Sequence, residues 1–245
     1  MGYFVYGMVR GESGPIPEGL LGIDAEPVST VAAGSVAALV SPVEDEDILP
    51  MRAHLKAFQS VITSTAANSD VLPVSFGLVA RDESQVEEVL ADNGEVLERE
   101  LSRIGGKVEY TLRLNFAGDN VFAWFTEQDP RVRRLRDSMF EGGREPTRDE
   151  KIALGQAFEE ALEGRRQAEN ARLADALADL TAEISPVSYA SEAGVAALAL
   201  LVPRENRNLL DARIDEIAAQ YSDDFMFEFT GPWPPYSFIE LSLAI

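Results

Sequence analysis

The most regular segment of the chain reads Lys107-Val108-Glu109-Tyr110-Thr111-Leu112-Arg113-Leu114-Asn115-Phe116, in which polar and apolar side chains alternate strictly. Such alternation is typical of a β-strand with one face buried and the other exposed. Directly before it, Gly105-Gly106 ends an apolar helical pattern, and glycine pairs commonly separate one element from the next. The sequence therefore predicts an N-terminal domain over 1–105, a second domain over 106–230 and a tail over 231–245.

Upstream of Gly105, the pattern predicts a small α+β domain. The expected elements are strands over 3–9, 28–31 and 36–40, a helix over 51–66, a strand over 71–79 and a helix over 83–101. The second and third strands flank Ala33-Gly34 and should form a hairpin. Pro73 favours a strand start or a sheet edge, because proline cannot donate a ladder hydrogen bond.

The helix expected over 51–66 carries two further predictions. Leu55, Phe58 and Ile62 recur at helical spacing and should form its inward face. The acidic run 44–47 and Pro50 precede it, so we expect the carboxylates near its first turn, where they complement the helix dipole. This structural interpretation is favoured over a metal site, since no other ligand cluster accompanies the run.

Downstream of Phe116, the pattern predicts a second α+β domain. The expected elements are a helix over 147–182, strands over 187–190 and 195–202, a helix over 206–221, and strands over 225–229 and 238–245. Thr147 followed by Glu150 is the signature of a capping box, whereas 120–126 fits either a helical turn or a short strand. The order β-(helices)-β-β-α-β predicts a ferredoxin-like split βαβ domain with an enlarged helical crossover.

The tail opens with Gly231-Pro232-Trp233-Pro234-Pro235-Tyr236-Ser237-Phe238. Its prolines exclude a helix interior or a central strand, yet its aromatic side chains favour burial. We expect the segment to leave the last strand of the second domain and to pack on the first domain. On that interpretation Trp233→Ala should cost about 3–5 kcal/mol of stability, the usual range for a buried tryptophan.

Composition and charge exclude several classes of protein. The formal net charge is −21, both halves are negative, and such a field disfavours nucleic-acid and anionic membrane partners. The absence of cysteine excludes disulfides, thiolate metal sites and cysteine nucleophiles. The first residues lack a basic n-region and no apolar run approaches the ~18 residues of a membrane span, so we expect a cytoplasmic protein.

Two features could carry chemistry. His54 is the only histidine, but no nucleophile or orienting partner stands near it in sequence, so a structural role is preferred. Arg131, Arg133, Arg134 and Arg136 form the only basic cluster, which could grip a phosphate or pair with nearby carboxylates; pairing is preferred. Phosphate-loop, dinucleotide and hydrolase motifs are absent, so no cofactor, metal or catalytic residue is expected.

Several segments, taken in order, resemble the GvpL/GvpF family of gas vesicle proteins across essentially the whole chain. They are Tyr3–Gly7, His54–Ile62, Val71–Gly77, Gly106–Tyr110 and Gly231–Phe238. The motif residues singled out, with a structural role expected, are His54, Phe58, Pro73, Phe76, Gly77, Gly231, Pro232, Trp233, Pro234, Pro235 and Tyr236. Ser75 departs from the pattern, because a basic residue is usual there in the family.

The resemblance implies a non-enzymatic accessory or minor structural protein of gas vesicles. It implies binding to the small hydrophobic shell protein, with help in nucleation and prevention of aggregation, in the cytoplasm or at the vesicle. It does not say which surface binds. The competing hypothesis is a ferredoxin-like enzyme or small-ligand sensor that uses His54 or the arginine cluster in an interdomain pocket. A third is a scaffold that joins other accessory proteins.

Overall fold

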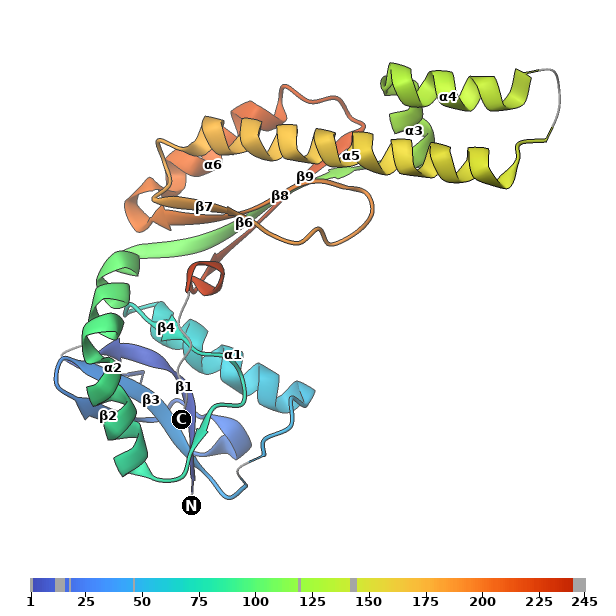
Figure 1. Ribbon diagram of the computed structural model, residues 1–245. Coiled ribbons are helices and arrows are strands. Elements are labelled where there is room, and N and C mark those ends of the chain that lie inside the picture. Colours follow the sequence, from blue (N-terminus) through green and yellow to red (C-terminus); the bar gives the residue numbers. More distant parts are fainter. Residues whose placement is uncertain are drawn as a thin grey trace. The chain divides into compact units, whose positions relative to one another are not determined.

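A computed structural model describes residues 2–11, 16–17, 19–45, 47–118, 120–141 and 145–239. The chain divides into two compact units: unit 1 comprises 1–109 and 232–245, and unit 2 comprises 110–231. Each unit contains its own antiparallel sheet and helices (Figure 1), which confirms the predicted α+β class. The predicted domain boundaries stay a proposal, which this division supports.

The sheet of unit 1 has β1 (Gly2–Arg10) in its interior, in the order β2-β3-β1-β4. The predicted hairpin is confirmed: β2 (Ser29–Ala33) and β3 (Val36–Val43) flank Gly34, whose φ of +63° suits glycine. Both faces of the sheet are covered. Val5 and Met8 pack in one core cluster with α2 (Glu83–Ile104), while Phe4 and Tyr6 pack in another with α1 (Arg52–Ala66).

Two predictions about α1 are wrong. The acidic run does not lie in its first turn, because the helix begins at Arg52 after Pro50. Leu55 is 43% exposed, whereas His54 is buried. The buried stripe of α1 is centred on His54, Phe58, Val61, Ile62 and Thr65, and Leu55 falls outside it.

The strand expected over 71–79 is interrupted. Only β4 (Leu72–Pro73) and β5 (Val79–Ala80) pair with β1. Val74 still donates its N–H to the Tyr6 carbonyl (3.2 Å), and Leu78 accepts the Val5 N–H (2.9 Å). The intervening residues 75–77 therefore leave the sheet edge, and the φ of +96° at Gly77 allows the chain to return. The edge position predicted for Pro73 is confirmed.

The sheet of unit 2 has the strand order β7-β8-β6-β9. Its strands are β6 (Lys107–Phe116), β7 (Glu183–Pro186), β8 (Gly194–Pro203) and β9 (Phe225–Trp233). Its helices are α3 (Val121–Gln128), α4 (Pro130–Phe140), α5 (Arg148–Leu177) and α6 (Arg207–Ala218). This order supports the ferredoxin-like arrangement, which stays a prediction for unit 2.

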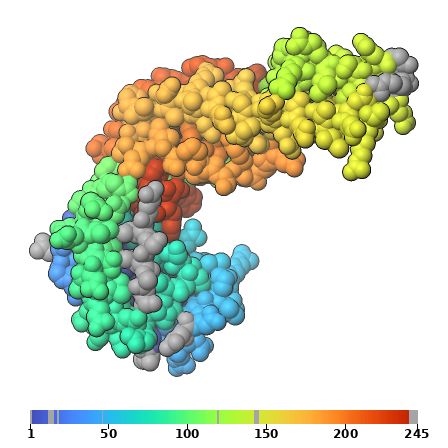
Figure 2. Space-filling view, in the orientation of Figure 1, coloured from blue at the N-terminus to red at the C-terminus, as the bar shows by residue number. Residues whose placement is uncertain are grey.

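The helices of unit 2 follow local sequence signals closely. The capping box at Thr147 is confirmed, with the Thr147 N–H donating to Glu150 at 2.8 Å. Segment 120–126 is helical, because the Asn120 side chain caps α3 by accepting the Ala123 N–H. Figure 2 shows that α5 stays on the surface of unit 2 along much of its length.

Three boundaries in unit 2 differ from the prediction. α5 ends at Leu177 rather than near 182, and the strand expected over 187–190 lies instead at 183–186. β9 continues through Pro232 to Trp233, which is possible because β9 is an edge strand, the position in a sheet where proline is tolerated. The final strand predicted over 238–245 lies largely outside the described residues. Among the described helices, none is long and apolar enough to cross a membrane.

Candidate functional site

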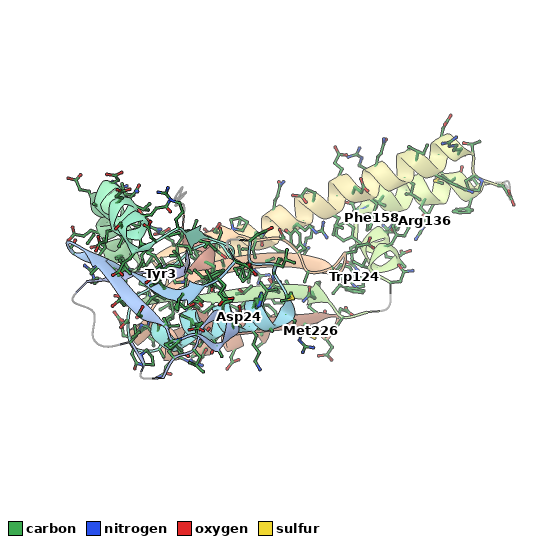
Figure 3. All side chains as sticks on the ribbon, turned by 90° about the horizontal axis from the view of Figure 1, so that it is seen from below. Tyr3, Asp24, Trp124, Arg136, Phe158 and Met226 are labelled. Carbon is green, nitrogen blue, oxygen red and sulfur yellow. The ribbon has the colours of Figure 1, made fainter. Side chains whose placement is uncertain are left out.

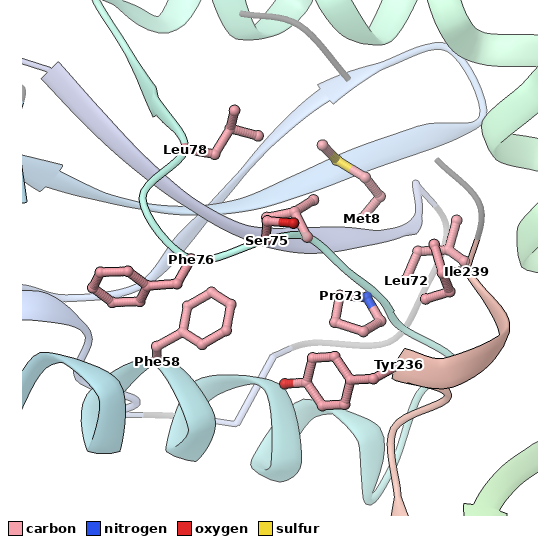
Figure 4. A pocket seen from close by; sticks show the side chains of 10 residues that line it. Met8, Phe58, Leu72, Pro73, Ser75, Phe76, Leu78, Tyr236 and Ile239 are labelled. Carbon is pink, nitrogen blue, oxygen red and sulfur yellow. The ribbon is translucent and has the colours of Figure 1, made fainter. Parts of the chain in front are cut away.

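Unit 1 contains an apolar groove with a volume of about 580 Å³. It is lined by Met8 of β1, Phe58 of α1, the stretch 72–76, Leu78, and Tyr236 and Ile239 of the tail (Figure 4). Among the lining side chains, only those of Ser75 and Tyr236 carry polar atoms, while backbone atoms contribute most of the remaining polar surface, which makes up nearly half of the lining. Concave, largely apolar surfaces of this size are the usual form of binding sites in proteins.

An aromatic cluster forms one side of the apolar groove. Phe76 lies with its ring centroid 5.3 Å from that of Phe4 and 5.5 Å from that of Phe58. The buried Tyr6 ring stacks on the Phe58 ring, with 6.0 Å between the ring centroids. Phe76 reaches this cluster because residues 75–77 leave the sheet edge, so the interruption of the predicted strand is what shapes the groove.

The tail forms the opposite side of the apolar groove. Its short 3-10 helix η4 (Tyr236–Phe238) follows Pro234 and Pro235, which are buried. Figure 4 shows the Tyr236 ring directed from the tail toward α1. Burial and the nearby charge of Glu109 raise the pKa of the Tyr236 phenol to about 12, so the hydroxyl is neutral at physiological pH.

Two charged side chains hold η4 in place. The Glu109 carboxylate accepts the Ser237 N–H at 2.8 Å and the Ser237 hydroxyl at 2.7 Å. The Arg103 guanidinium donates to the Phe238 carbonyl. Burial raises the pKa of the Glu109 carboxyl above its ordinary value, although the hydrogen bonds from Ser237 act in the opposite direction.

The groove brings together segments that are far apart in the sequence. Phe58 comes from the 54–62 segment, Pro73 and Phe76 from the 71–77 segment, and Tyr236 from the 231–238 segment. Glu109, from the 106–110 segment, holds the tail wall. Sequence reasoning did not single out Glu109, because an acidic residue on the polar face of a strand is expected to be solvated.

The remaining motif residues do not line the groove. His54 lies one turn before Phe58, with Nδ1 2.8 Å from the Leu49 carbonyl and Nε2 3.3 Å from the Asp24 carboxylate. These contacts tie the start of α1 to η1 (Ile23–Ala25), consistent with a structural role. Gly77, with positive φ, supports the turn beside Phe76.

Gly231, Pro232 and Trp233 end β9, and the prediction of a buried tryptophan is wrong. Trp233 is 38% exposed, because it lies on an edge strand. We now expect Trp233→Ala to lower the free energy of unfolding by about 1 kcal/mol, as is usual outside a core. Thermal unfolding measures this loss, with Phe238→Ala as the comparison, because Phe238→Ala truncates a buried side chain of the same tail. A Trp233→Ala loss as large as that of Phe238→Ala would contradict the exposed placement.

Two exposed apolar side chains, Met51 and Leu55, lie at the start of α1, close in sequence to the groove residue Phe58. Leu55 precedes Phe58 by three residues, and Met51 precedes Leu55 by four, which places them on neighbouring positions of one helix face. Met51 is 52% exposed and Leu55 43%. Leu55, which was predicted to be a core residue, is therefore part of the surface. Exposed apolar side chains near a groove can extend the area that a partner binds.

Edge strands in both units carry prolines. Pro73 lies in β4, Pro186 in β7 and Pro232 in β9, and each of these strands is the last of its sheet. A proline removes the backbone donor that an added strand would need. These edges are therefore poorly suited to binding a partner by strand addition.

The arginine cluster lies on α4, and two of its four members form ion pairs within unit 2. Arg131 binds Glu160 of α5 at 2.8 Å, and Arg136 binds Glu127 and Asp137. Figure 3 shows Arg136 and Phe158 on the adjacent helices α4 and α5. Within the described ranges, no group of three or more His, Asp or Glu side chains could hold a metal ion.

Comparison with known proteins gives consistent matches along the whole chain. The family model described as gas vesicle synthesis protein GvpL/GvpF matches residues 2–240. Gas vesicle protein F of Streptomyces sp. (strain CB03234) is 31% identical over 242 residues, covering 98% of this chain and 100% of that protein. Gas vesicle protein L2 of Halobacterium salinarum is 30% identical, covering 89% of this chain and 83% of that protein.

The fold also matches a solved structure. The crystal structure of gas vesicle protein GvpF from Microcystis aeruginosa superposes with a TM-score of 0.78 at 25% sequence identity. The match covers 98% of this chain and 99% of that one. The relatives are named as gas vesicle proteins rather than as enzymes.

Proposed function

Since the chain belongs to the GvpL/GvpF family of gas vesicle synthesis proteins, we propose that it binds the hydrophobic gas vesicle shell protein in the apolar groove of unit 1. In this role it is a non-enzymatic accessory protein that keeps shell subunits from aggregating and assists nucleation of the vesicle. The observation that carries the proposal is the convergence of the family segments on one apolar groove. It acts in the cytoplasm and at the gas vesicle, with other accessory proteins as a second class of partner.

The groove and the surface charge have complementary tasks in this proposal. The apolar lining, extended by Met51 and Leu55, offers an apolar side chain of the client a place out of water. The net charge of −21 keeps the complex in solution, because like-charged particles repel one another. An acidic surface alone would not indicate such a client; the groove supplies the reason for one.

The geometry favours insertion of client side chains over addition of a client strand. Pro73 lies at the edge of the sheet beside the groove and offers no N–H there. An incoming group instead meets the side chains of Val74, Ser75, Phe76, Leu78 and Tyr236. In this mode the affinity for the shell protein comes from burial of apolar surface, so it should change little as the salt concentration rises.

The competing hypothesis of an enzyme or ligand sensor finds less support. It required His54 or the arginine cluster to converge on a polar pocket. Both ring nitrogens of His54 instead contact Leu49 and Asp24. Arg131 and Arg134 do line an open hollow of about 910 Å³, but all of its lining residues belong to unit 2, and Arg131 binds Glu160 there. It is therefore not the interdomain pocket that this hypothesis requires.

Ser75→Asp tests the groove without removing an apolar side chain. Ser75 is exposed and lines the groove, so an added carboxylate would have to be desolvated when an apolar client enters. We expect binding of the shell protein to weaken about tenfold or more, which corresponds to ~1.4 kcal/mol. Pull-down and light scattering of aggregating shell protein measure binding and protection.

Ser191→Asp is the matched control, because it adds the same charge at an exposed serine of unit 2. It should leave shell-protein binding unchanged, and both variants should melt as the parent protein does. If Ser75→Asp and the parent protein bind the shell protein equally well, the shell protein binds outside the groove. A parent protein that neither binds shell subunits nor delays their aggregation would reject the function itself.

A further inference from the structure

The hairpin of α4 and α5 in unit 2 has one face that no described element covers. Figure 1 shows α3, α4 and the first half of α5 extending beyond the sheet of this unit. Next to α3 the hairpin is closed by aromatic contacts, since the Phe158 ring lies 4.6 Å from the Phe122 ring and 5.7 Å from the Phe125 ring, centroid to centroid. The uncovered face is the open hollow of about 910 Å³, which is lined by α4 and α5.

The floor of this hollow suits the approach of another helix. It consists of Leu135 of α4 with Ala153 and Ala157 of α5. Short alanine side chains let a neighbouring helix come close, and the half-buried leucine offers it an apolar contact. Ile152 is 47% exposed and lies one turn before the lining residue Gln156, so it extends the apolar surface along α5.

The two rims of the hollow carry opposite charges. Arg134 lines it from α4 and Glu159 lines it from α5, and both side chains are exposed. Among the described residues neither of them forms an ion pair, whereas Arg131 and Glu160 bind each other at 2.8 Å. The hollow therefore presents one unpaired cation and one unpaired anion, on different helices.

A face of this kind is complementary to itself. In a two-fold symmetric contact each copy uses the same surface, so every contact occurs twice. With the axis parallel to the hairpin, α4 of one copy lies against α5 of the other, and each Arg134 meets the partner's Glu159. The mixed lining also argues against other occupants, because Glu159 and Glu160 disfavour an acidic helix and Arg131 and Arg134 disfavour a basic one.

We propose that the chain forms a dimer through this hollow, in which two hairpins of α4 and α5 pair as a four-helix bundle. The inference goes beyond the proposed function, because the hollow and the apolar groove have no lining residue in common. The dimer carries two apolar grooves, so it can hold two shell subunits at once and gain avidity for an assembly of them. That consequence alone rests on the proposed function.

The size and charge of the face make this dimer weak and reversible. The 11 residues of α4 span about 16 Å, so the contact is smaller than the ~800 Å² per partner of a standard interface. Repulsion between two chains of net charge −21 opposes association. At physiological ionic strength it is screened over about 8 Å, whereas the paired rims lie in direct contact.

Sedimentation of charge-exchanged variants tests the dimer. The mean mass of the parent protein should rise toward that of a dimer between micromolar and millimolar concentration. Arg134→Glu alone and Glu159→Arg alone should remain monomeric, because like charges then face each other. An equal mixture of the two should dimerise, since both cross-contacts regain opposite charges. Arg99→Glu, at an exposed arginine of α2, is the matched control and should dimerise as the parent does.

Disulfide trapping tests the placement, because the chain contains no cysteine of its own. Under mild oxidation Ala153→Cys should form a covalent dimer several-fold faster than Ala171→Cys, which lies at an exposed position of α5 outside the hollow. A parent protein that stays monomeric at every concentration would overturn the dimer. A mixture of the charge variants that stays monomeric, or equal trapping of the two cysteines, would overturn the pairing of the hairpins. The shell protein takes no part in these measurements, so they are independent of the proposed function.

Discussion

Replacing Phe58 by alanine is expected to lower the free energy of unfolding of unit 1 by about 3–5 kcal/mol, the range for truncating a buried phenylalanine. Phe58 is 7% exposed, and its ring lies within 6.0 Å, centroid to centroid, of the rings of Phe4, Tyr6 and Phe76. The substitution would leave a cavity among three aromatic rings. Urea denaturation followed by circular dichroism measures the loss, and exchange of β1 amides assigns it to unit 1.

Leu55→Ala is the control for Phe58→Ala on the same helix. Its side chain is 43% exposed, so the expected cost is below about 1 kcal/mol. In the proposed function, however, Leu55 extends the binding surface, so its truncation should weaken shell-protein binding more than it weakens the fold. Equal losses of stability for the two variants would mean that the buried face of α1 has been misassigned.

Gly22→Ala is expected to cost about 3 kcal/mol, although it adds a single methyl group. A Cβ at this position would overlap the Tyr6 hydroxyl and lie 2.9 Å from the Ser41 hydroxyl oxygen. The Tyr6 hydroxyl contacts Ser41 at 2.7 Å and accepts the Ile23 N–H at 2.7 Å, with both bonds buried. The cost combines overpacking, about 1–3 kcal/mol, with the loss of a buried hydrogen bond, about 1–3 kcal/mol.

Gly94→Ala is the matched control for Gly22→Ala. It lies inside α2, and a Cβ there meets no atom within 4 Å. Alanine has the higher helix propensity, so this variant should gain up to about 1 kcal/mol. Opposite signs for the two glycine substitutions in one denaturation series are the expected result. A Gly22→Ala protein as stable as the parent would show that the Tyr6 hydroxyl is not held as described.

Some elements were determined by the sequence alone, because their signals are local. The alternation over 107–116 predicted β6, and the Thr147–Glu150 spacing predicted the start of α5. Glycine at 34 predicted the β2–β3 turn. In each case the periodicity, the cap or the backbone preference acts within a few residues, so no distant contact could override it.

Burial and the groove were decided only by the tertiary structure. The 71–79 segment reads as one strand, but Phe76 is drawn into the ring cluster of Phe4 and Phe58, and the strand is interrupted. Leu55 and Trp233 read as core residues, yet no element covers them fully. Burial depends on which distant elements pack over a side chain, and periodicity contains no such information.

Glu109 is the opposite case: the sequence pattern predicts that it is exposed, but it is buried. Its place in the alternating strand predicts an exposed residue, and the alternation itself is correct. Yet Ser237, 128 positions later in the chain, covers and binds the carboxylate. The sequence determined the strand, the caps and the family; the return of the tail onto unit 1 decided where the groove lies and which charge holds it.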